Sequence, residues 1–351
     1  MREIYNALKS CWEEGKRSIL ATIIKVEGSA YQREGARCLL LESGEVIGMI
    51  SGGCVEGDLL EHAKDVILSH TPKKVVYDFN GNEDDLWGLG VGCNGVITVW
   101  LEPFDPIDQK EKTKQILDEI EARLHCNQPY YFFMCIESSE PDKIEVGQYL
   151  STFHQKQKKN CFNGSMKAGI IETVIEGGKV RGFVELVNPL PSLLIVGAGP
   201  DAALLARRAH DLNWRVNVMD HRKQNLTSLF PEVNHLLIKR GNYSSLNLPT
   251  NPYIVIMTHN LELDYLALQT FIQCNFCYIG VLGSHQRMRK LVGLLKESLH
   301  GIDQDKMAKI HSPIGLDIGA QGPEEITVSI MSELIAVKNG RAGGSLSRLW
   351  I

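Results

Sequence analysis

The chain has 351 residues, 44% hydrophobic and 23% charged, a composition typical of a soluble globular protein with more than one domain. Its formal net charge of −5 gives no polybasic surface of the kind that binds nucleic acid. No secretory signal or membrane-spanning run is present and the nine cysteines fit reduced thiols, so we expect a cytoplasmic protein without nucleic-acid or membrane partners.

The first half of the chain mixes helical patterns with strands and lacks a regular alternation of the two. Apolar periodicity predicts helices over 3–14, 55–69 and 110–124 and strands over 18–26, 38–41, 46–50, 75–79, 96–101 and 130–136. Residues 138–163 are polar and weakly patterned, and strand-like alternation resumes over 164–187. We therefore expect an α+β domain over 1–188, which ends at the linker Asn188-Pro189-Leu190-Pro191.

After this linker, apolar runs alternate with helical patterns up to the end of the chain. The runs predict strands over 193–196, 216–219, 236–238, 254–257 and 278–282, with helices between them. Strands that alternate with helices form parallel β-α-β units. We expect an α/β domain over 189–351, built on a Rossmann-type parallel sheet.

A glycine-rich loop joins the first of these strands to its helix. Gly197 permits a tight turn, Gly199 lets a diphosphate approach the backbone, and Ala202 allows close packing of helix and strand. The free amides of the helix N-terminus favour an anion there. The loop therefore predicts a dinucleotide-type binding site.

Polar residues at three further strand ends face the same crevice by topology. Asp220 follows Gly199 by 21 residues and is placed to bind a ribose diol, although the adjacent His221 and Arg222 leave a 2′-phosphate open. The other predicted contacts, of which Arg287 is a candidate for a second anion, are His259, Gly283, Ser284 and Arg287. The loop that begins at His311 is a further candidate lining segment.

Cys54 stands where a predicted hairpin strand turns into a helix, inside the segment Ser51-Gly52-Gly53-Cys54-Val55-Glu56. A helix N-terminus favours a reactive thiolate, but these residues alone fit a small buried cysteine better. Cys93, also flanked by glycines, has no assigned role, and packing explains the pair Cys274 and Cys277 better than redox chemistry. No His, Cys and Asp cluster has metal-ligand spacing, so we expect no protein-only metal site.

Several long segments, in this order, resemble the XdhC/CoxI family. They are Ser51-Gly52-Gly53-Cys54-Val55-Glu56-Gly57, the Gly197-Ala198-Gly199-Pro200 loop with Asp220, Ile279-Gly280-Val281-Leu282-Gly283-Ser284, and the run from His311 to Ala320 followed by Pro323-Glu324-Glu325-Ile326. The resemblance spans nearly the whole chain and is weak over 104–189.

This resemblance implies an accessory factor for xanthine dehydrogenase and related molybdenum hydroxylases, a maturation chaperone and not a turnover enzyme. Such proteins bind molybdenum cofactor, protect it while a cysteine desulfurase helps to install its terminal sulfido ligand, and pass it to the apoenzyme. In this chain Asp220 and Arg287 would hold the phosphorylated end of the ligand. Ser51, Gly52, Gly53 and Glu56 would shape the loop from which Cys54 contacts the molybdenum or its sulfur. We also expect a homodimer.

Two other functions fit the same residues. The glycine loop and Asp220 suit an NAD(P)-dependent oxidoreductase, but hydride transfer needs a positioned acid or base, and only scattered histidines are available. A nucleotide-sensing regulator would keep the Rossmann site and make Cys54 structural. Bound NAD(P) beside the molybdenum cofactor also stays open.

Overall fold

The computed structural model describes residues 1–53, 55–79, 95–150, 167–231, 233–243, 251–298 and 304–347. The chain divides into two compact units, Met1–Pro189 and Leu190–Ile351, so the division falls inside the proline-containing segment 188–191. Among the described helices, none combines the length and apolar character needed to cross a bilayer.

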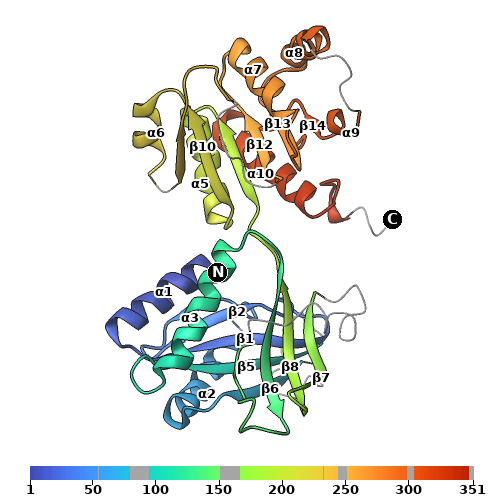
Figure 1. The fold of residues 1–351 in the computed structure, drawn as a ribbon. Helices are drawn as coiled ribbons and strands as arrows, with labels where there is room; N and C mark the ends of the chain where they lie inside the picture. The colour runs from blue at the N-terminus through green and yellow to red at the C-terminus, as the bar shows by residue number, and fades with distance from the viewer. Residues whose placement is uncertain are drawn as a thin grey trace. The chain divides into compact units, whose positions relative to one another are not determined.

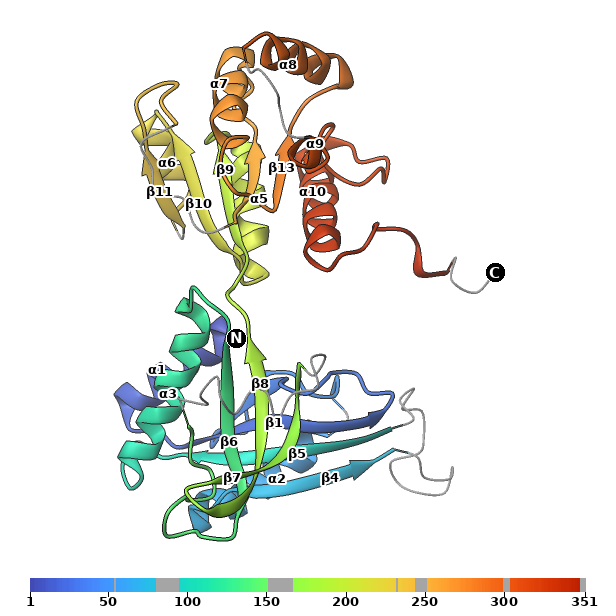
Figure 2. The ribbon, with the colours of Figure 1, turned by 45° about the vertical axis from the view of Figure 1, so that its right-hand side comes forward.

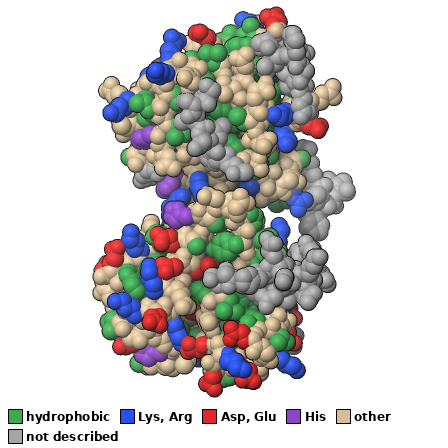
Figure 3. Space-filling view, in the orientation of Figure 1, with side chains coloured by type: hydrophobic (Ala, Val, Ile, Leu, Met, Phe, Trp, Pro, Cys, Tyr) green, Lys and Arg blue, Asp and Glu red, His purple; other side chains and the backbone are tan. Residues whose placement is uncertain are grey.

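A five-stranded antiparallel sheet forms the centre of the first unit (Figure 1). Its strands, in the order β3-β2-β1-β5-β4, are β3 (Val46–Gly48), β2 (Arg37–Leu41), β1 (Ser18–Gly28), β5 (Gly95–Phe104) and β4 (Lys73–Asp78). Alternate residues of β1 serve the two faces. Ile19 packs with helix α2 (Glu56–Ser69), whereas Leu20 packs with α1 (Arg2–Glu14) and α3 (Lys110–His125). Figure 3 shows acidic and basic side chains interspersed on the exposed surface of this unit.

A second, three-stranded antiparallel sheet completes this unit, and its order is β6-β8-β7. The strands are β6 (Tyr130–Ser138), β7 (Ala168–Ile175) and β8 (Gly178–Val187). Phe132 and Phe183 pack on Trp100 of β5. Glu185 of β8 is largely buried and accepts hydrogen bonds from Arg37 and Arg123, each at 2.8 Å, so the charges between the two sheets are paired.

The second unit has a six-stranded parallel sheet in the order β11-β10-β9-β12-β13-β14. The strands are β9 (Ser192–Val196), β10 (Arg215–Asp220), β11 (Asn234–Leu237), β12 (Tyr253–Ile256), β13 (Tyr278–Val281) and β14 (Ile310–His311). With β9 as the first strand, this is the strand order of a dinucleotide-binding Rossmann fold. The expected fold class, a Rossmann-type domain after an α+β domain, is confirmed.

Helices cover both faces of this sheet (Figure 1 and Figure 2). Leu193 and Ile195 pack with α5 (Pro200–Asp211) and α10 (Gly322–Lys338). Leu194 and Val196 pack on the opposite face with α7 (Leu261–Phe271) and α8 (His285–Ser298). Short helices α6 (Lys223–Leu229) and α9 (Gln304–Met307) lie in the connections. Because β9 is buried on both faces, its sequence is a continuous apolar run.

The sixth strand was not predicted. His311 was expected to begin a glycine-interrupted loop, whereas Ile310 and His311 pair with Ile279 and Gly280 of β13. Two residues are too few to give an alternating pattern, so only the parallel pairing reveals this strand.

Candidate functional site

In the glycine-rich loop after β9, position 197 can accommodate only glycine. Its φ is +112°, and a Cβ atom there would lie 2.6 Å from the carbonyl oxygen of Met257 at the end of β12. Gly199 is the N-cap of α5, and Pro200 opens the helix. The loop therefore lies directly against β12, at the point between β9 and β12 where strand order reverses and ligands bind in such sheets.

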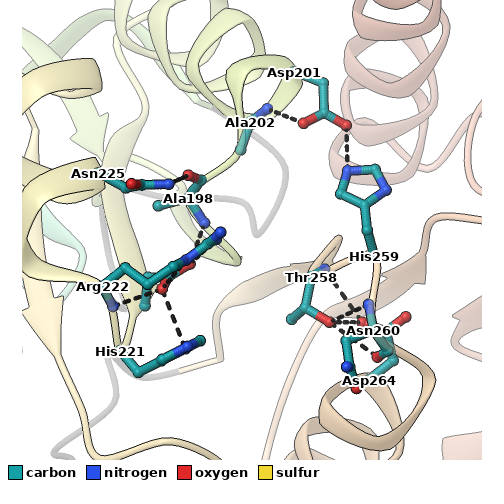
Figure 4. A network of polar contacts seen from close by, with 11 residues as sticks. Ala198, Asp201, Ala202, His221, Arg222, Asn225, Thr258, His259, Asn260 and Asp264 are labelled. Atoms are coloured by element: carbon teal, nitrogen blue, oxygen red, sulfur yellow. Dashed lines mark hydrogen bonds and ion pairs between the residues drawn. The ribbon is translucent and has the colours of Figure 1, made fainter.

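Asp201 lies in the first turn of α5 and its carboxylate contacts both the backbone of that turn and His259 (Figure 4). Its Oδ1 accepts a hydrogen bond from the backbone N–H of Ala202 at 3.0 Å, and His259 Nε2 lies 2.9 Å from its Oδ2. His259 follows β12 in the left-handed conformation with φ +60°, and its side chain is 60% exposed. Asp201 had no role among the residues predicted from sequence, although an acid in the first helical turn after Gly199 was a usable signal.

Asp220, at the end of β10, is buried and surrounded by hydrogen-bond donors, of which Ala198 and Arg222 are labelled in Figure 4. Its Oδ2 accepts from the N–H of Ala198 and from Arg222 Nη2, both at 2.7 Å. Its Oδ1 accepts from the N–H of Arg222 at 2.8 Å and from Nε of the same residue at 2.9 Å. Burial raises the pKa of Asp220, but these hydrogen bonds outweigh burial and lower the pKa to about 2. The carboxylate thus fixes the glycine loop to the β10 end.

Asp264 of α7 is a fully buried carboxylate that sequence reasoning missed. Its Oδ1 accepts hydrogen bonds from the hydroxyl and the N–H of Thr258, at 2.5 and 3.2 Å. Its Oδ2 accepts from Arg287, by Nε at 3.0 Å and also by Nη2. Asp264 therefore joins the end of β12 to the start of α8 and occupies part of the Arg287 guanidinium.

Gly283 and Ser284 determine the conformation of the segment that opens α8. Gly283 has φ +141°, and a Cβ atom there would lie 2.5 Å from Cδ of Arg287. The Ser284 hydroxyl accepts a hydrogen bond from the N–H of Arg287 at 3.3 Å. These two predicted residues thus give Arg287 room and orient it toward Asp264.

The loop that begins at His311 is anchored by Glu333 of α10. Glu333 accepts hydrogen bonds from the buried Tyr278 hydroxyl and from the N–H of Gly315, the latter at 2.8 Å, and lies 2.9 Å from His311 Nδ1. Burial raises the pKa of Glu333, but its partners lower the pKa below the ordinary value of 4.5. Glu333 was not singled out from the sequence, because its three partners are remote along the chain.

In the first unit, Glu56 organises the segment before α2. Its carboxylate accepts from the N–H groups of Ile50 at 3.1 Å, Ser51 at 2.9 Å, Gly53 at 3.0 Å and Val55 at 3.2 Å, and from the Ser51 hydroxyl at 2.5 Å. Burial raises its pKa, but the Ser51 hydroxyl and the backbone N–H groups lower it to about 2. One carboxylate therefore determines the shape of this loop.

Cys54 and Cys93 lie outside the described residues. Cys274 and Cys277 are free and partly buried, and Cys277 packs on the sheet of the second unit. Within the described ranges, one group has metal-like geometry, His70, Asp105 and Asp108. The Arg17 guanidinium already contacts both carboxylates, at 2.8 and 2.5 Å, so this group carries no argument for a metal.

These features define a class: a Rossmann-type domain that follows an α+β domain with a carboxylate-organised glycine loop. Residues 193–334 match the model of the XdhC Rossmann domain, and residues 11–78 match that of the XdhC and CoxI family. The chain belongs to the XdhC/CoxI family, as the sequence resemblance predicted.

Two relatives and one solved structure are similar along most of the chain. The chain is 30% identical to a probable subunit of xanthine dehydrogenase from Bacillus subtilis, over 96% of this chain and 98% of the relative. It is 23% identical to the molybdenum cofactor insertion chaperone PaoD of Escherichia coli, over 92% of this chain and 84% of the relative. A crystal structure of a xanthine dehydrogenase from Bacillus halodurans superposes with a TM-score of 0.74, at 28% identity and 98% coverage of both chains.

Proposed function

We propose that this protein is an accessory factor that binds molybdenum cofactor and inserts it into a xanthine dehydrogenase-type molybdoenzyme. The observation that carries the proposal is the near full-length similarity to a probable xanthine dehydrogenase subunit and to a molybdenum cofactor insertion chaperone. The cofactor is cargo in this account, and its client performs the chemistry. We further propose that the protein works in the cytoplasm as a homodimer, while a cysteine desulfurase supplies the sulfur of the terminal sulfido ligand.

The loop of the first unit suits close approach of a large ligand. Gly52 and Gly53 are exposed, with φ of +80° and +109°, and the space where a Cβ atom of Gly53 would lie is open. Glu56 holds the N–H groups of Gly53 and Val55, the two neighbours of Cys54 in sequence. We propose that Ser51, Gly52, Gly53 and Glu56 shape the binding loop and that Cys54 contacts the molybdenum or its sulfur.

For the phosphorylated end of the cofactor we propose the crevice of the Rossmann unit. Its proposed contacts are Gly197, Gly199, His259, Gly283, Ser284 and Arg287. Asp220 shapes this crevice through its hydrogen bonds to Ala198 and Arg222. Arg287 keeps 25% of its side chain exposed while it holds Asp264, and His259 is more exposed still. Basic groups at a strand-end crevice favour an anionic ligand.

Retention of cofactor on a desalting column tests this function. The purified protein is incubated with molybdenum cofactor and, separately, with NAD(H) and NADP(H), and the protein fraction is assayed for pterin fluorescence and nucleotide absorbance. We expect wild type to retain pterin and Cys54→Ala to lose it, because the thiolate is the proposed metal contact. Cys274→Ala, which removes a partly buried thiol of the second unit, is the matched control and should retain pterin.

Two results would contradict the proposal. Unchanged pterin retention by Cys54→Ala removes the role of that cysteine. Retention of nicotinamide nucleotide without pterin, with turnover of a small alcohol or aldehyde, favours the oxidoreductase alternative.

A further inference from the structure

The carboxyl ends of β10 and β11 bring basic side chains together. Arg222 and Lys223 follow β10, Lys239 and Arg240 follow β11, and all four are exposed. The N–H of Ile238 donates to the carbonyl oxygen of Asp220 at 3.1 Å, so the two strand ends run side by side. Figure 3 shows Lys and Arg side chains on the surface around α6, which follows β10. We call Arg222, Lys223, Lys239 and Arg240 the basic corner.

Asp220 is the one acidic residue among the described residues 220–231 and 233–243, and it has no capacity left for a ligand. A carboxylate offers about four lone-pair positions. Ala198 and Arg222 fill these with four hydrogen bonds of 2.7 to 2.9 Å. In addition, His221 Nδ1 lies 3.3 Å from Oδ1 of Asp220. A ribose diol must donate two O–H groups to such a carboxylate, so it would first have to displace Arg222.

Arg222 itself keeps donors for a ligand. A guanidinium has five N–H groups, and the contact with Asp220 uses one on Nε and one on Nη2. The other three have no hydrogen-bond partner among the described residues, and 47% of the side chain is exposed. Asp220 fixes one edge of the guanidinium and leaves the other oriented toward solvent, which is the preorganisation that planar anion recognition needs.

We propose that the basic corner is a subsite for a phosphate monoester, in place of the unmodified ribose diol that Asp220 alone suggests. The monoester belongs either to a nucleotide 2′-phosphate or to the terminal phosphate of molybdopterin. The proposal rests on the Rossmann crevice being a ligand site, as proposed above, and it names the group bound there and the residue that selects it. Arg222 is the specificity-determining residue.

Two isomeric nucleotides test the subsite on the full-length protein. Adenosine 2′,5′-bisphosphate and adenosine 3′,5′-bisphosphate carry the same charge, and titration calorimetry compares their affinities. We expect the 2′ isomer to bind more tightly. Arg222→Gln should abolish that preference by lowering the affinity for the 2′ isomer about 10- to 100-fold, typical of the loss of a charge-assisted contact.

Arg222→Gln also frees Asp220, so adenosine 5′-monophosphate with its intact diol should bind more tightly to the variant than to wild type. Arg208→Gln, which removes a 67% exposed arginine of α5, is the matched control and should resemble wild type.

A second arm identifies the source of the phosphate. Molybdopterin and its phosphatase-treated form are each passed over a desalting column with wild type and with Arg222→Gln. Loss of pterin retention both on dephosphorylation and in Arg222→Gln assigns the subsite to the pterin phosphate, whereas loss of the 2′ preference alone assigns it to a nucleotide. If Arg222→Gln changes neither ligand, the subsite proposal is wrong. If wild type binds the 2′ isomer but retains no pterin in any form, the subsite stands and the proposed chaperone function fails.

Discussion

Replacement of Glu56 by Gln is expected to lower the free energy of unfolding of the N-terminal unit by about 2–3 kcal/mol at neutral pH. The carboxylate of Glu56 accepts five hydrogen bonds from the segment 50–55, and an amide cannot accept all of them because its NH2 group is itself a donor. The loop that carries Cys54 in sequence should open, and cofactor retention should fall with it. Hydrogen exchange of peptides covering 46–60 measures this opening.

The effect of Glu56→Gln should also depend on pH. The folded-state pKa of Glu56 is about 2, below the ordinary value of 4.5, so its contribution is complete above about pH 4.5 and is lost as pH falls toward 2. The stability difference between wild type and Glu56→Gln should therefore shrink over that window. Glu61→Gln, at an exposed position of the same helix, provides the control and should cost less than about 0.5 kcal/mol. A difference that stays constant from pH 6 to pH 2 would refute the assignment.

Gly197→Ala is expected to lower the free energy of unfolding of the second unit by about 3–5 kcal/mol, more than Glu56→Gln costs the first unit. The substitution combines a left-handed φ of +112° with a Cβ atom 2.6 Å from the carbonyl oxygen of Met257, so the loop or the end of β12 must shift. The obstructing atom belongs to the backbone, which cannot move aside as a flexible side chain does. The substitution should therefore distort the ligand crevice as well as destabilise the unit. Hydrogen exchange of peptides covering 192–203 and 253–258 measures the loss of stability and the distortion of the crevice.

Gly293→Ala is the matched control for this glycine. It lies inside α8 with open space around the position of a Cβ atom, so alanine there should stabilise the helix by up to about 1 kcal/mol. If Gly197→Ala and Gly293→Ala alter stability equally, the steric account of the loop is incorrect.

The features that the sequence predicted correctly are local in the chain. The glycine loop, its strand and its helix lie within a short segment, and two-sided burial leaves apolar runs that identify β9, β10 and β12. Members of a family share long contiguous motifs of this kind, so the resemblance to the XdhC/CoxI family could also be recognised from the sequence. The sheet β6-β8-β7 lies where motif resemblance was weakest, and only strand alternation indicated it.

The partners of the site residues were not predictable, because they lie far apart in sequence. His259 meets Asp201 across 58 residues, and Asp264 meets Arg287 across 23. Asp220 was assigned to a ribose diol from its position alone, and its occupation by Arg222 depends on side-chain geometry that spacing does not encode. The role of every candidate ligand contact stays a prediction.

Transfer of cofactor to a cofactor-free client tests the central claim most directly. The protein is loaded with sulfurated molybdenum cofactor, freed of excess ligand, and mixed with an apo xanthine dehydrogenase-type enzyme, and the client's molybdenum content and hydroxylase activity are followed. We predict that the loaded protein activates the client faster and more completely than the same amount of free cofactor, and that Cys54→Ala does not. Activation no better than with free cofactor would contradict the account.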